Sequence, residues 1–287
     1  MKPAISTVAC PEWTLERVFE FARKIDVTGV ELRTFGDDSS QFAPDPCLTD
    51  FAKIRRLSAQ SGVSIACLAT SIRYDAPIFP PVVGRVVSQT QIEVRATKRM
   101  IDVAREVKAP FVRVFAFELG AKETRKAGLR RIIERMELAA ACARNTGVRL
   151  LIENGGSFAT AEDLNEIMDR LASTHVAAAY CPAVAQSVGE DPVEGVRMLG
   201  ERLESVKLKD FVGTTAVPIG HGEMHCREVV EELARRNYGG WAVIEWDRLW
   251  LSGLEAAERV LPQSVADLMG WYAGARAKAG PRAMAMS

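Results

Sequence analysis

Charged side chains recur where short apolar segments of this 287-residue sequence end. They include Glu31 and Arg33 in VELR, Arg113 in FVRVF, Glu153 in LLIENGG and Glu245 in WAVIEWD. A single charge of this kind marks only the point where a strand reaches water. When several parallel strands end in charge on one side of a sheet, their side chains converge, and carboxylates and cations together suit a polar small molecule. The pattern therefore predicts a polar site for small-molecule chemistry.

Two lysines join this set in the segment SVKLKDF, residues 205–211. Val206 and Leu208 alternate with Lys207 and Lys209, as they do in a strand with one apolar and one polar face. If the apolar face packs against helices, both ammonium groups point into the space that the sheet encloses. The alternation thus predicts positive charge inside the sheet.

The elements that must position these residues form a repeat of strand and helix. Segments of helical period separate eight apolar segments that predict strands, at residues 4–9, 27–33, 63–70, 111–117, 148–153, 176–181, 205–210 and 241–246. No composition shift or Ser/Gly-rich linker divides the chain. Its length and repeat predict an α/β protein that forms a single (β/α)8 TIM barrel over residues 1–276. A doubly wound open sheet is the rival fold, but no glycine-rich phosphate loop follows the first predicted strand to support it.

Two segments stand outside this repeat. Residues 71–90 are long and proline-rich, which predicts a loop over the mouth of the barrel rather than a plain connection. Residues 277–287 are predicted to form a flexible C-terminal tail.

Composition argues against several classes of function. The 37 basic residues balance 37 acidic ones, so no net charge favours nucleic acid or an anionic membrane. Six cysteines without a C-x-x-C pair indicate reduced thiols. The sequence has neither an apolar signal core nor a run of about eighteen apolar residues. We therefore expect a soluble, cytoplasmic protein with no nucleic-acid or membrane partner.

Five segments in this order resemble the sugar phosphate isomerase/epimerase family, also called xylose isomerase-like TIM barrels: TGVELR, VRLLIENGGSFATAEDL, GEDPVEGVRMLGERLESVKLKDF, PIGHGEMHCREVVEEL and YGGWAVIEWD. The resemblance implies a divalent metal, often manganese, at the C-terminal mouth. Members bind it with a Glu on strand five, an Asp on strand six, a His on strand seven and a Glu on strand eight. The two Glu also act as acid and base, moving a proton beside a carbonyl through an enediolate. Glu153 and Glu245 occupy these two positions.

The other positions of that metal site differ from the family pattern. Cys181, in CPAV, replaces the ligand Asp, and Val184 replaces a following His. Lys207, in KLKD, stands in the place of the ligand His, and Gly155, in ENGG, replaces a frequent accessory His. Of the strand-seven motif, only the Lys-Asp pair at 209–210 matches.

These replacements predict a degenerate metal site. A protonated lysine has no lone pair for a metal, and its charge repels one. We therefore expect the ammonium of Lys207 to occupy the metal's place and to bridge Glu153 and Glu245, whose mutual repulsion it would cancel. On this interpretation no cofactor is needed. If the metal site is retained, manganese or zinc would bind Glu153, Glu245 and a deprotonated Cys181, with Lys207 swung aside.

Further residues are candidates for contact with a substrate. By resemblance, Arg113 and Glu31 occupy positions that face substrate, although an Arg–Glu pair across the barrel is an equal alternative. Trp246 would either stack on a sugar ring or cap the barrel. Cys181 is favoured as a passive thiol, because no histidine base is visible to activate it. His221, in GHGEMH, is a candidate ligand contact, but a solvated loop is favoured there over a metal site.

Three functions are consistent with these residues. The leading one is a sugar isomerase or epimerase that moves a proton alpha to a carbonyl with Glu153 and Glu245, while Lys207 or Lys209 stabilises the oxyanion. A polyol dehydratase or lyase uses the same enolisation step. The third is a member that binds a sugar-like ligand, or serves as a partner subunit, without catalysis. The family's endonuclease branch is rejected because the chain lacks a histidine-rich zinc cluster and a basic face. The resemblance also implies a homodimer.

Overall fold

Eight parallel strands close into a barrel in the computed structural model, which describes residues 1–35, 41–42, 50–76 and 92–279. The strands are β1 (Lys2–Ser6), β2 (Gly29–Phe35), β4 (Ser64–Arg73), β5 (Phe111–Phe115), β6 (Arg149–Glu153), β7 (Val176–Tyr180), β8 (Leu203–Leu208) and β11 (Trp241–Ile244). They follow the order β1-β11-β8-β7-β6-β5-β4-β2, and pairing of β1 with β2 closes the ring. Each overlaps one of the eight predicted segments, so the predicted (β/α)8 TIM barrel is confirmed.

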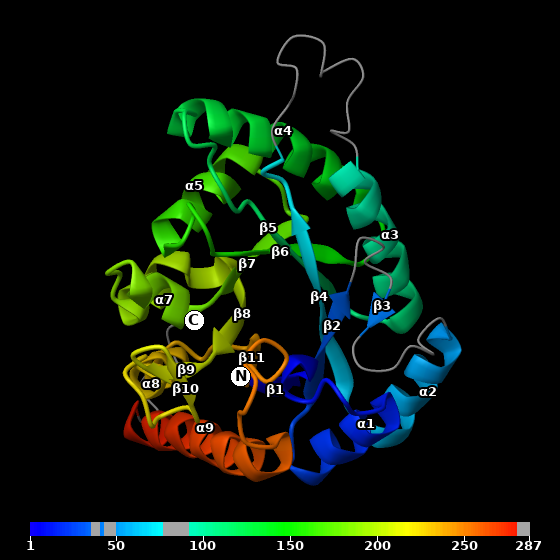
Figure 1. Ribbon diagram of the computed structural model, residues 1–287, viewed down its shortest axis with the longest axis vertical. Helices are drawn as coiled ribbons and strands as arrows, with labels where there is room; N and C mark the ends of the chain where they lie inside the picture. The colour runs from blue at the N-terminus through cyan, green and yellow to red at the C-terminus, as the bar shows by residue number, and fades with distance from the viewer. Residues whose placement is uncertain (36–40, 43–49, 77–91, 280–287) are drawn as a thin grey trace.

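Helices alternate with these strands and form a ring outside them (Figure 1). They are α1 (Leu15–Lys24), α2 (Phe51–Ser61), α3 (Ile92–Val107), α4 (Arg125–Cys142), α5 (Ala161–Leu171), α6 (Pro182–Ser187), α7 (Pro192–Leu199), α8 (Cys226–Arg235) and α9 (Ala257–Ala279). Shorter elements lie outside the repeat: the 3-10 turns Thr7–Ala9 and Gly200–Arg202, and the strands β3 (Gln41–Phe42), β9 (Asp210–Val212) and β10 (Thr215–Val217). Strand β3 pairs antiparallel with the end of β2, and β9 pairs antiparallel with β10.

The two segments expected to leave the repeat are only partly described. Residues 71–73 belong to the end of β4, whereas residues 77–91 lie outside the described part of the chain. Helix α9 continues to Ala279, so the first three residues of the expected tail are helical. Residues 280–287 lie outside the described part. The loop over the mouth and the tail therefore stay predictions.

Local sequence signals determine where several helices begin. Side-chain oxygens of Thr14, Asp50, Thr124 and Thr160 accept hydrogen bonds from backbone N–H groups in the first turns of α1, α2, α4 and α5. Thr160 also forms a capping box with Asp163. Such caps satisfy N–H groups that have no partner within the helix. They fix the points at which loops at the barrel mouth turn back into helices.

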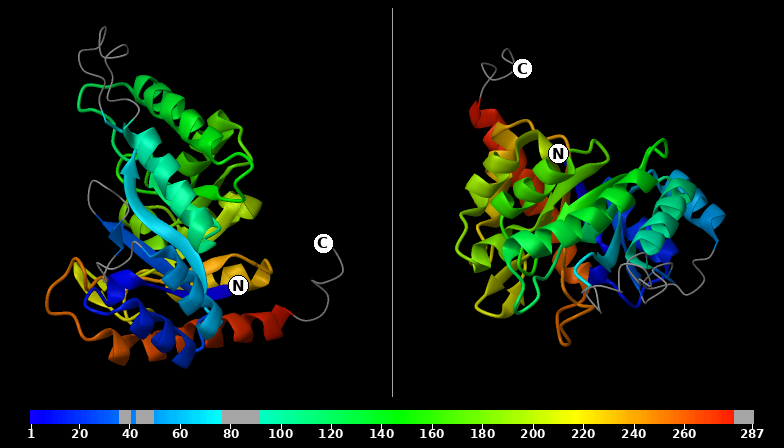
Figure 2. Two further views of the ribbon diagram at one scale, coloured as in Figure 1. Left: turned by 90° about the vertical axis from the view of Figure 1, so that its right-hand side faces the viewer. Right: turned by 90° about the horizontal axis from the view of Figure 1, so that it is seen from above.

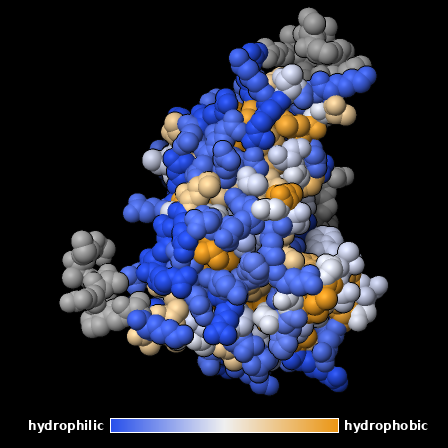
Figure 3. Space-filling view, turned by 90° about the vertical axis from the view of Figure 1, so that its left-hand side faces the viewer, coloured by the Kyte–Doolittle hydropathy of each residue, from blue (hydrophilic) through white to orange (hydrophobic). Residues whose placement is uncertain are grey.

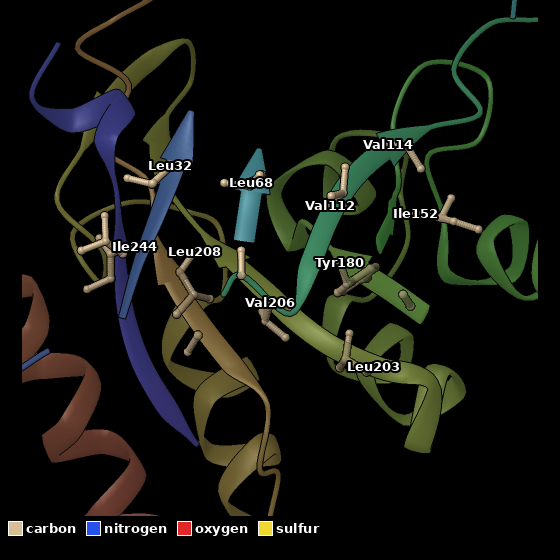
Figure 4. Packing of buried hydrophobic residues seen from close by; sticks show 14 of the residues in the cluster. Leu32, Leu68, Val112, Val114, Ile152, Tyr180, Leu203, Val206, Leu208 and Ile244 are labelled. Carbon is tan, nitrogen blue, oxygen red and sulfur yellow. The ribbon is translucent and has the colours of Figure 1, made fainter. Parts of the chain in front are cut away.

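Alternation along the strands divides the apolar side chains into two layers. Outward-facing side chains such as Leu68, Val112 and Val206 pack against the helices in one large cluster (Figure 4). Inward-facing side chains form a smaller layer inside the barrel: Ala4, Ala66, Cys67, Phe111, Leu151, Ala177, Ala179, Trp241 and Val243. The large Trp241 ring fits because Gly29 lies against it, where a Cβ atom would lie only 2.3 Å from the ring.

A charged layer lies next to this inner apolar layer, toward the C-terminal ends of the strands. Residues two apart in a strand face the same side. The inward positions that follow Gly29, Phe111, Leu151, Ser205 and Val243 are therefore taken by charged residues: Glu31, Arg113, Glu153, Lys207 and Glu245. The sequence alternation noted at Lys207 thus places its ammonium group inside the barrel, as predicted.

The outer surface of the helix ring is mostly polar. Figure 3 shows the side that carries α5, α7 and α8, where hydrophilic residues predominate and apolar residues form small separate areas. Figure 2 shows the N-terminus at one end of the barrel and the segment after β11 at the other. None of the described helices is long and apolar enough to cross a membrane.

Candidate active site

Lys207 lies at the centre of three buried carboxylates. Its Nζ atom lies 3.4 Å from Glu31 Oε1, 3.2 Å from Glu153 Oε2 and 2.9 Å from Glu245 Oε2. These partners come from β2, β6 and the end of β11, so the cluster exists only when the barrel has closed. All four side chains are at most 9% exposed. The structure thus places Lys207 between Glu153 and Glu245 and adds Glu31 as a third partner.

Two further cations complete the charged layer. Arg113 Nη1 lies 3.2 Å from Glu153 Oε2. Lys209 Nζ lies 3.2 Å from Glu245 Oε1, on the other oxygen from the one that Lys207 contacts. Each of the two glutamates therefore pairs with two cations, one of which is shared.

The cations decide the ionisation of these glutamates. Burial alone would raise the pKa of Glu153 and Glu245, because it disfavours a charged carboxylate. Arg113 and Lys207 outweigh burial at Glu153, and Lys207 and Lys209 outweigh it at Glu245, so the pKa of each glutamate is lowered. Burial and the charge of Arg113 also act to lower the pKa of Lys207, yet the carboxylates raise it. At neutral pH Glu153, Glu245 and Lys207 are therefore ionised, and Glu153 and Glu245 are weak bases while their cations stay in place.

Asp247 is a further carboxylate beside this group that the sequence analysis did not single out. Its Oδ2 atom lies 3.5 Å from Lys209 Nζ, and its side chain is 7% exposed. Burial and the charge of Glu245 raise the pKa of Asp247. Its Oδ1 atom has no hydrogen-bond partner among the described residues. The sequence could have indicated Asp247, because it lies two residues after Glu245 and so continues the inward face of the strand.

A cavity of about 510 Å³ opens above the charged layer. Its wall comprises Val8, Arg33, Ser71, Arg73, Arg113, Phe115, Phe117, Glu153, Glu245 and Trp250. The size suits a small molecule, and the wall combines carboxylates, guanidinium groups and aromatic rings. Within the described part of the chain, Lys207 and Glu31 are buried and do not belong to this wall. Of the charged layer, a bound molecule would therefore meet Glu153, Glu245 and Arg113.

The match to a known protein family agrees with this architecture. The family described as xylose isomerase-like TIM barrel matches residues 19–266. The chain belongs to the xylose isomerase-like TIM barrel family. No curated protein sequence gives a significant match.

Solved structures share the fold of this family member over nearly its whole length. An L-ribulose 3-epimerase has a TM-score of 0.80 at 14% identity, with 100% of both chains covered. The probable 3-DHS dehydratase of petrobactin synthesis from Bacillus anthracis has a TM-score of 0.75 at 14% identity, over 94% of this chain and 99% of the other. The 3-keto-D-glucoside 4-epimerase of E. coli has a TM-score of 0.73 at 15% identity, again over 94% and 99%. At such identities the likeness establishes the barrel alone.

The residues at the family's usual metal position do not fit a divalent ion in this member. The ammonium group of Lys207 lies between the carboxylates, and it has no lone pair to donate and would repel a metal. Among the residues that the structure describes, no group of three or more His, Cys, Asp or Glu side chains could hold a metal ion. The alternative zinc set also needs Cys181 as a thiolate, whereas burial raises the pKa of that thiol.

Two of the predicted substrate contacts do not line the cavity. Cys181 is fully buried at the start of α6, where its backbone N–H donates to Asn154 Oδ1 at 2.7 Å. Trp246 packs in the outer apolar cluster, and its indole N–H donates to the Glu255 backbone oxygen at 2.8 Å. Neither belongs to the described cavity wall. The geometry therefore favours the passive thiol and the tryptophan that packs in the barrel wall.

His221 also lies away from the cavity wall. It is exposed in the segment between β10 and α8, so its contact with a ligand stays a prediction. Asp210 organises this segment by accepting three backbone hydrogen bonds, from Gly220 at 2.8 Å, Gly222 at 3.0 Å and Met224 at 3.0 Å. The Asp of the matching Lys-Asp pair thus holds the chain after β8, whereas its Lys belongs to the charged layer.

Several cavity residues were not revealed by the sequence pattern: Arg73, Phe115, Phe117 and Trp250. Arg73 reaches the rim because β4 shifts register against β5 between Ala69 and Arg73. Trp250 arrives from the far end of the chain, since the Leu249 N–H donates to the Val8 backbone oxygen at 3.1 Å. Both features depend on contacts between segments that are distant in sequence.

Proposed function

We propose that this family member is a sugar isomerase or epimerase that moves a proton alpha to a carbonyl of a small sugar, keto-sugar or polyol, without a divalent metal. The observation that supports this most is the composition of one cavity. Glu153, Glu245 and Arg113 line it together, and Lys207 bridges both carboxylates from below. Two carboxylates and a cation around one bound molecule are the groups that enolisation requires.

In the proposed reaction, one glutamate removes the proton from the carbon beside the carbonyl. The electron pair of the C–H bond forms a C=C bond with the carbonyl carbon, and the π electrons of the carbonyl move onto its oxygen, where Arg113 stabilises the developing negative charge. In an epimerisation, the other glutamate, after taking up a proton from solvent, protonates the same carbon on its opposite face, and the first glutamic acid releases its proton to solvent. In an isomerisation, the first glutamic acid protonates the former carbonyl carbon, and the hydroxyl proton of the other carbon passes to the former carbonyl oxygen. Arg113 takes the oxyanion role that the sequence suggested for Lys207 or Lys209, because Arg113 reaches the cavity wall.

Lys207 acts in this proposal as a fixed counter-ion. It holds two carboxylates close together that would otherwise repel, which is the task of a metal in other barrels of this kind. The ion pairs also make both glutamates weak bases before substrate binds. A substrate oxygen that takes hydrogen bonds from Arg113 weakens the pair between Arg113 and Glu153 and so raises the basicity of that carboxylate.

The lowered pKa of both glutamates equally favours a second candidate, a barrel that binds a sugar-like ligand without turnover. A carboxylate held at low pKa is a poor base for a C–H bond. A dehydratase or lyase shares the enolisation step and differs only in the loss of a leaving group from the intermediate.

Solvent exchange tests the proposal directly. The wild type would be incubated in deuterium oxide with a panel of ketoses and polyols, with a chelator or with manganese, and loss of each C–H signal followed by NMR. Glu153→Gln and Glu245→Gln should each slow exchange by about 100-fold or more. Glu204→Gln is the matched control, since Glu204 is ion-paired with Arg149 at 2.6 Å outside the cavity wall.

The outcomes separate the candidates. Exchange that is insensitive to the chelator and lost in both Gln variants supports the proposal. Exchange that needs manganese overturns the metal-free mechanism. Saturable binding without exchange of any probe favours the binding protein, and release of water from the substrate favours the dehydratase.

A further inference from the structure

One wall of the cavity gathers three guanidinium groups. Each lies over an aromatic ring of the same wall: Arg33 over Trp250 at 5.4 Å, Arg73 over Phe117 at 4.6 Å and Arg113 over Phe115 at 5.0 Å, measured to the ring centroid. Rings in this position hold a guanidinium in place while its N–H edge remains able to donate hydrogen bonds. Arginines set in this way are suited to planar or tetrahedral oxyanions.

The arginines occupy different depths of the cavity. Arg113 lies at the floor beside Glu153. Arg33 is 7% exposed and donates hydrogen bonds to the Ala69 backbone oxygen and to Ser71 Oγ, which orients its guanidinium. Arg73 is at the rim, where its side chain is 51% exposed and lies 3.5 Å from Asp75. The β2 and β4 side of the cavity is therefore cationic from the rim inward.

The carboxylates of the floor also pair with the lysines below them. Glu245 already pairs with Lys207 and Lys209, at 2.9 and 3.2 Å. Glu153 pairs with Lys207 from below. Burial, followed by the charge of Arg113, lowers the pKa of Arg33 to about 10. An anion bound beside Arg33 would favour its charged form and so raise this pKa.

We infer that the ligand of this cavity carries an anionic group, a carboxylate or a phosphate, that binds between Arg33 and Arg73. The rest of a sugar-like skeleton then extends along the wall toward Arg113, Glu153 and Glu245. A cavity of about 510 Å³ accommodates such a molecule as a whole. The position of the reacting end rests on the proposed function, whereas the anion subsite rests on the arginine wall alone.

Binding of matched probes tests the subsite without turnover. Isothermal titration calorimetry at low and high salt would compare D-fructose, D-fructose 6-phosphate and 2-keto-D-gluconate, with inorganic phosphate as the smallest probe. At least one anionic sugar should bind about tenfold more tightly than D-fructose, which is the scale of one charge-assisted hydrogen bond. The preferred probe tells phosphate from carboxylate.

Substitutions of the wall arginines test whether the preference for anionic probes arises at this subsite. Arg73→Gln should cost about fivefold to tenfold in affinity for the anionic probe and leave the affinity for D-fructose unchanged. Arg33→Gln should do the same if it folds, and Arg73, being exposed, keeps the test valid if it does not. Arg276→Gln is the matched control, because Arg276 lies over Tyr272 at 6.0 Å on α9, away from the cavity wall.

Equal affinity for neutral and anionic probes, or no saturable binding of any anionic probe in the millimolar range, overturns the inference. So does an Arg73→Gln variant with unchanged affinity for the anion. The proposed function fails separately: anion binding without solvent exchange leaves the subsite standing and removes the catalysis. Exchange of D-fructose with no preference for anions does the reverse.

Discussion

Lys207→Met should lower the free energy of unfolding much more at pH 8 than at pH 5.5. The substitution keeps a side chain of similar length but removes the ammonium that contacts Glu31, Glu153 and Glu245. Arg113 is then the one remaining cation in contact with Glu153 among the described residues. Removing one member of a buried ion pair costs about 3–5 kcal/mol, because an uncompensated charge is left behind.

The cost of protonating a buried carboxylate gives a second, independent value for the loss of unfolding free energy, and this value depends on pH. At least one of the three carboxylates must bind a proton in the variant. From the ordinary glutamate pKa of 4.5, protonation costs about 4.8 kcal/mol at pH 8 and about 1.4 kcal/mol at pH 5.5, at about 1.36 kcal/mol per unit. We therefore expect the free energy of unfolding to fall by about 3–5 kcal/mol at pH 8 and by about 1–2 kcal/mol at pH 5.5.

Stability should depend on pH in opposite directions in the wild type and in Lys207→Met. In the wild type, the pKa of Glu153 and Glu245 is lowered, so their contribution to stability is present above 4.5 and is lost as the pH falls below it. In the variant, a carboxylate without its cation has a raised pKa, so stability is lost as the pH rises through that value. The two curves should therefore approach each other in mild acid.

Urea-induced unfolding followed by tryptophan fluorescence at both pH values measures this difference. The control is Lys98→Met, whose exposed pair with Asp102 at 3.1 Å should contribute no more than about 0.5 kcal/mol. If Lys207→Met does not fold at pH 8, the double variant with Glu245→Gln should recover part of the loss. A loss below about 1 kcal/mol, or an equal loss at both pH values, would refute the role of Lys207 as the buried counter-ion.

Three further tests probe the surroundings of this cluster. Asp210→Ala should lower the free energy of unfolding by about 2–3 kcal/mol and speed limited proteolysis at residues 218–225, because three backbone N–H groups lose their acceptor; unchanged proteolysis would contradict this. Cys181 should resist iodoacetamide in the folded protein at pH 7.5 and react after unfolding, because burial raises the pKa of its thiol; rapid alkylation of the native protein would show an accessible thiolate. Lys207→His combined with Cys181→Asp should retain about one equivalent of manganese or zinc after desalting, measured by mass spectrometry, because four ligands of the kinds that bind these metals would then converge; a stoichiometric metal in the wild type that is lost in Glu245→Gln would show that Lys207 does not replace the ion.

The local sequence pattern was sufficient to predict several residues of the candidate active site. The alternation of Val206, Lys207 and Leu208 predicts an inward lysine, because strand side chains alternate whatever their partners are. Glu153 and Glu245 follow from the same rule together with the convergence of strand ends in a barrel. The rule also indicates that Trp246, next to an inward Glu245, packs outward, as the structure shows.

What the sequence determined by itself is the order of strands and helices and the inward face of each strand, since both depend on residues that are neighbours in the chain. Only the tertiary structure decided that Glu31 shares Lys207 with the other carboxylates, and that Arg73 and Trp250 line the cavity. These relations depend on strand register and on loops that meet across the barrel mouth. The low pKa of the glutamates was equally inaccessible, because it is set by distances of about 3 Å between charges contributed by four different strands.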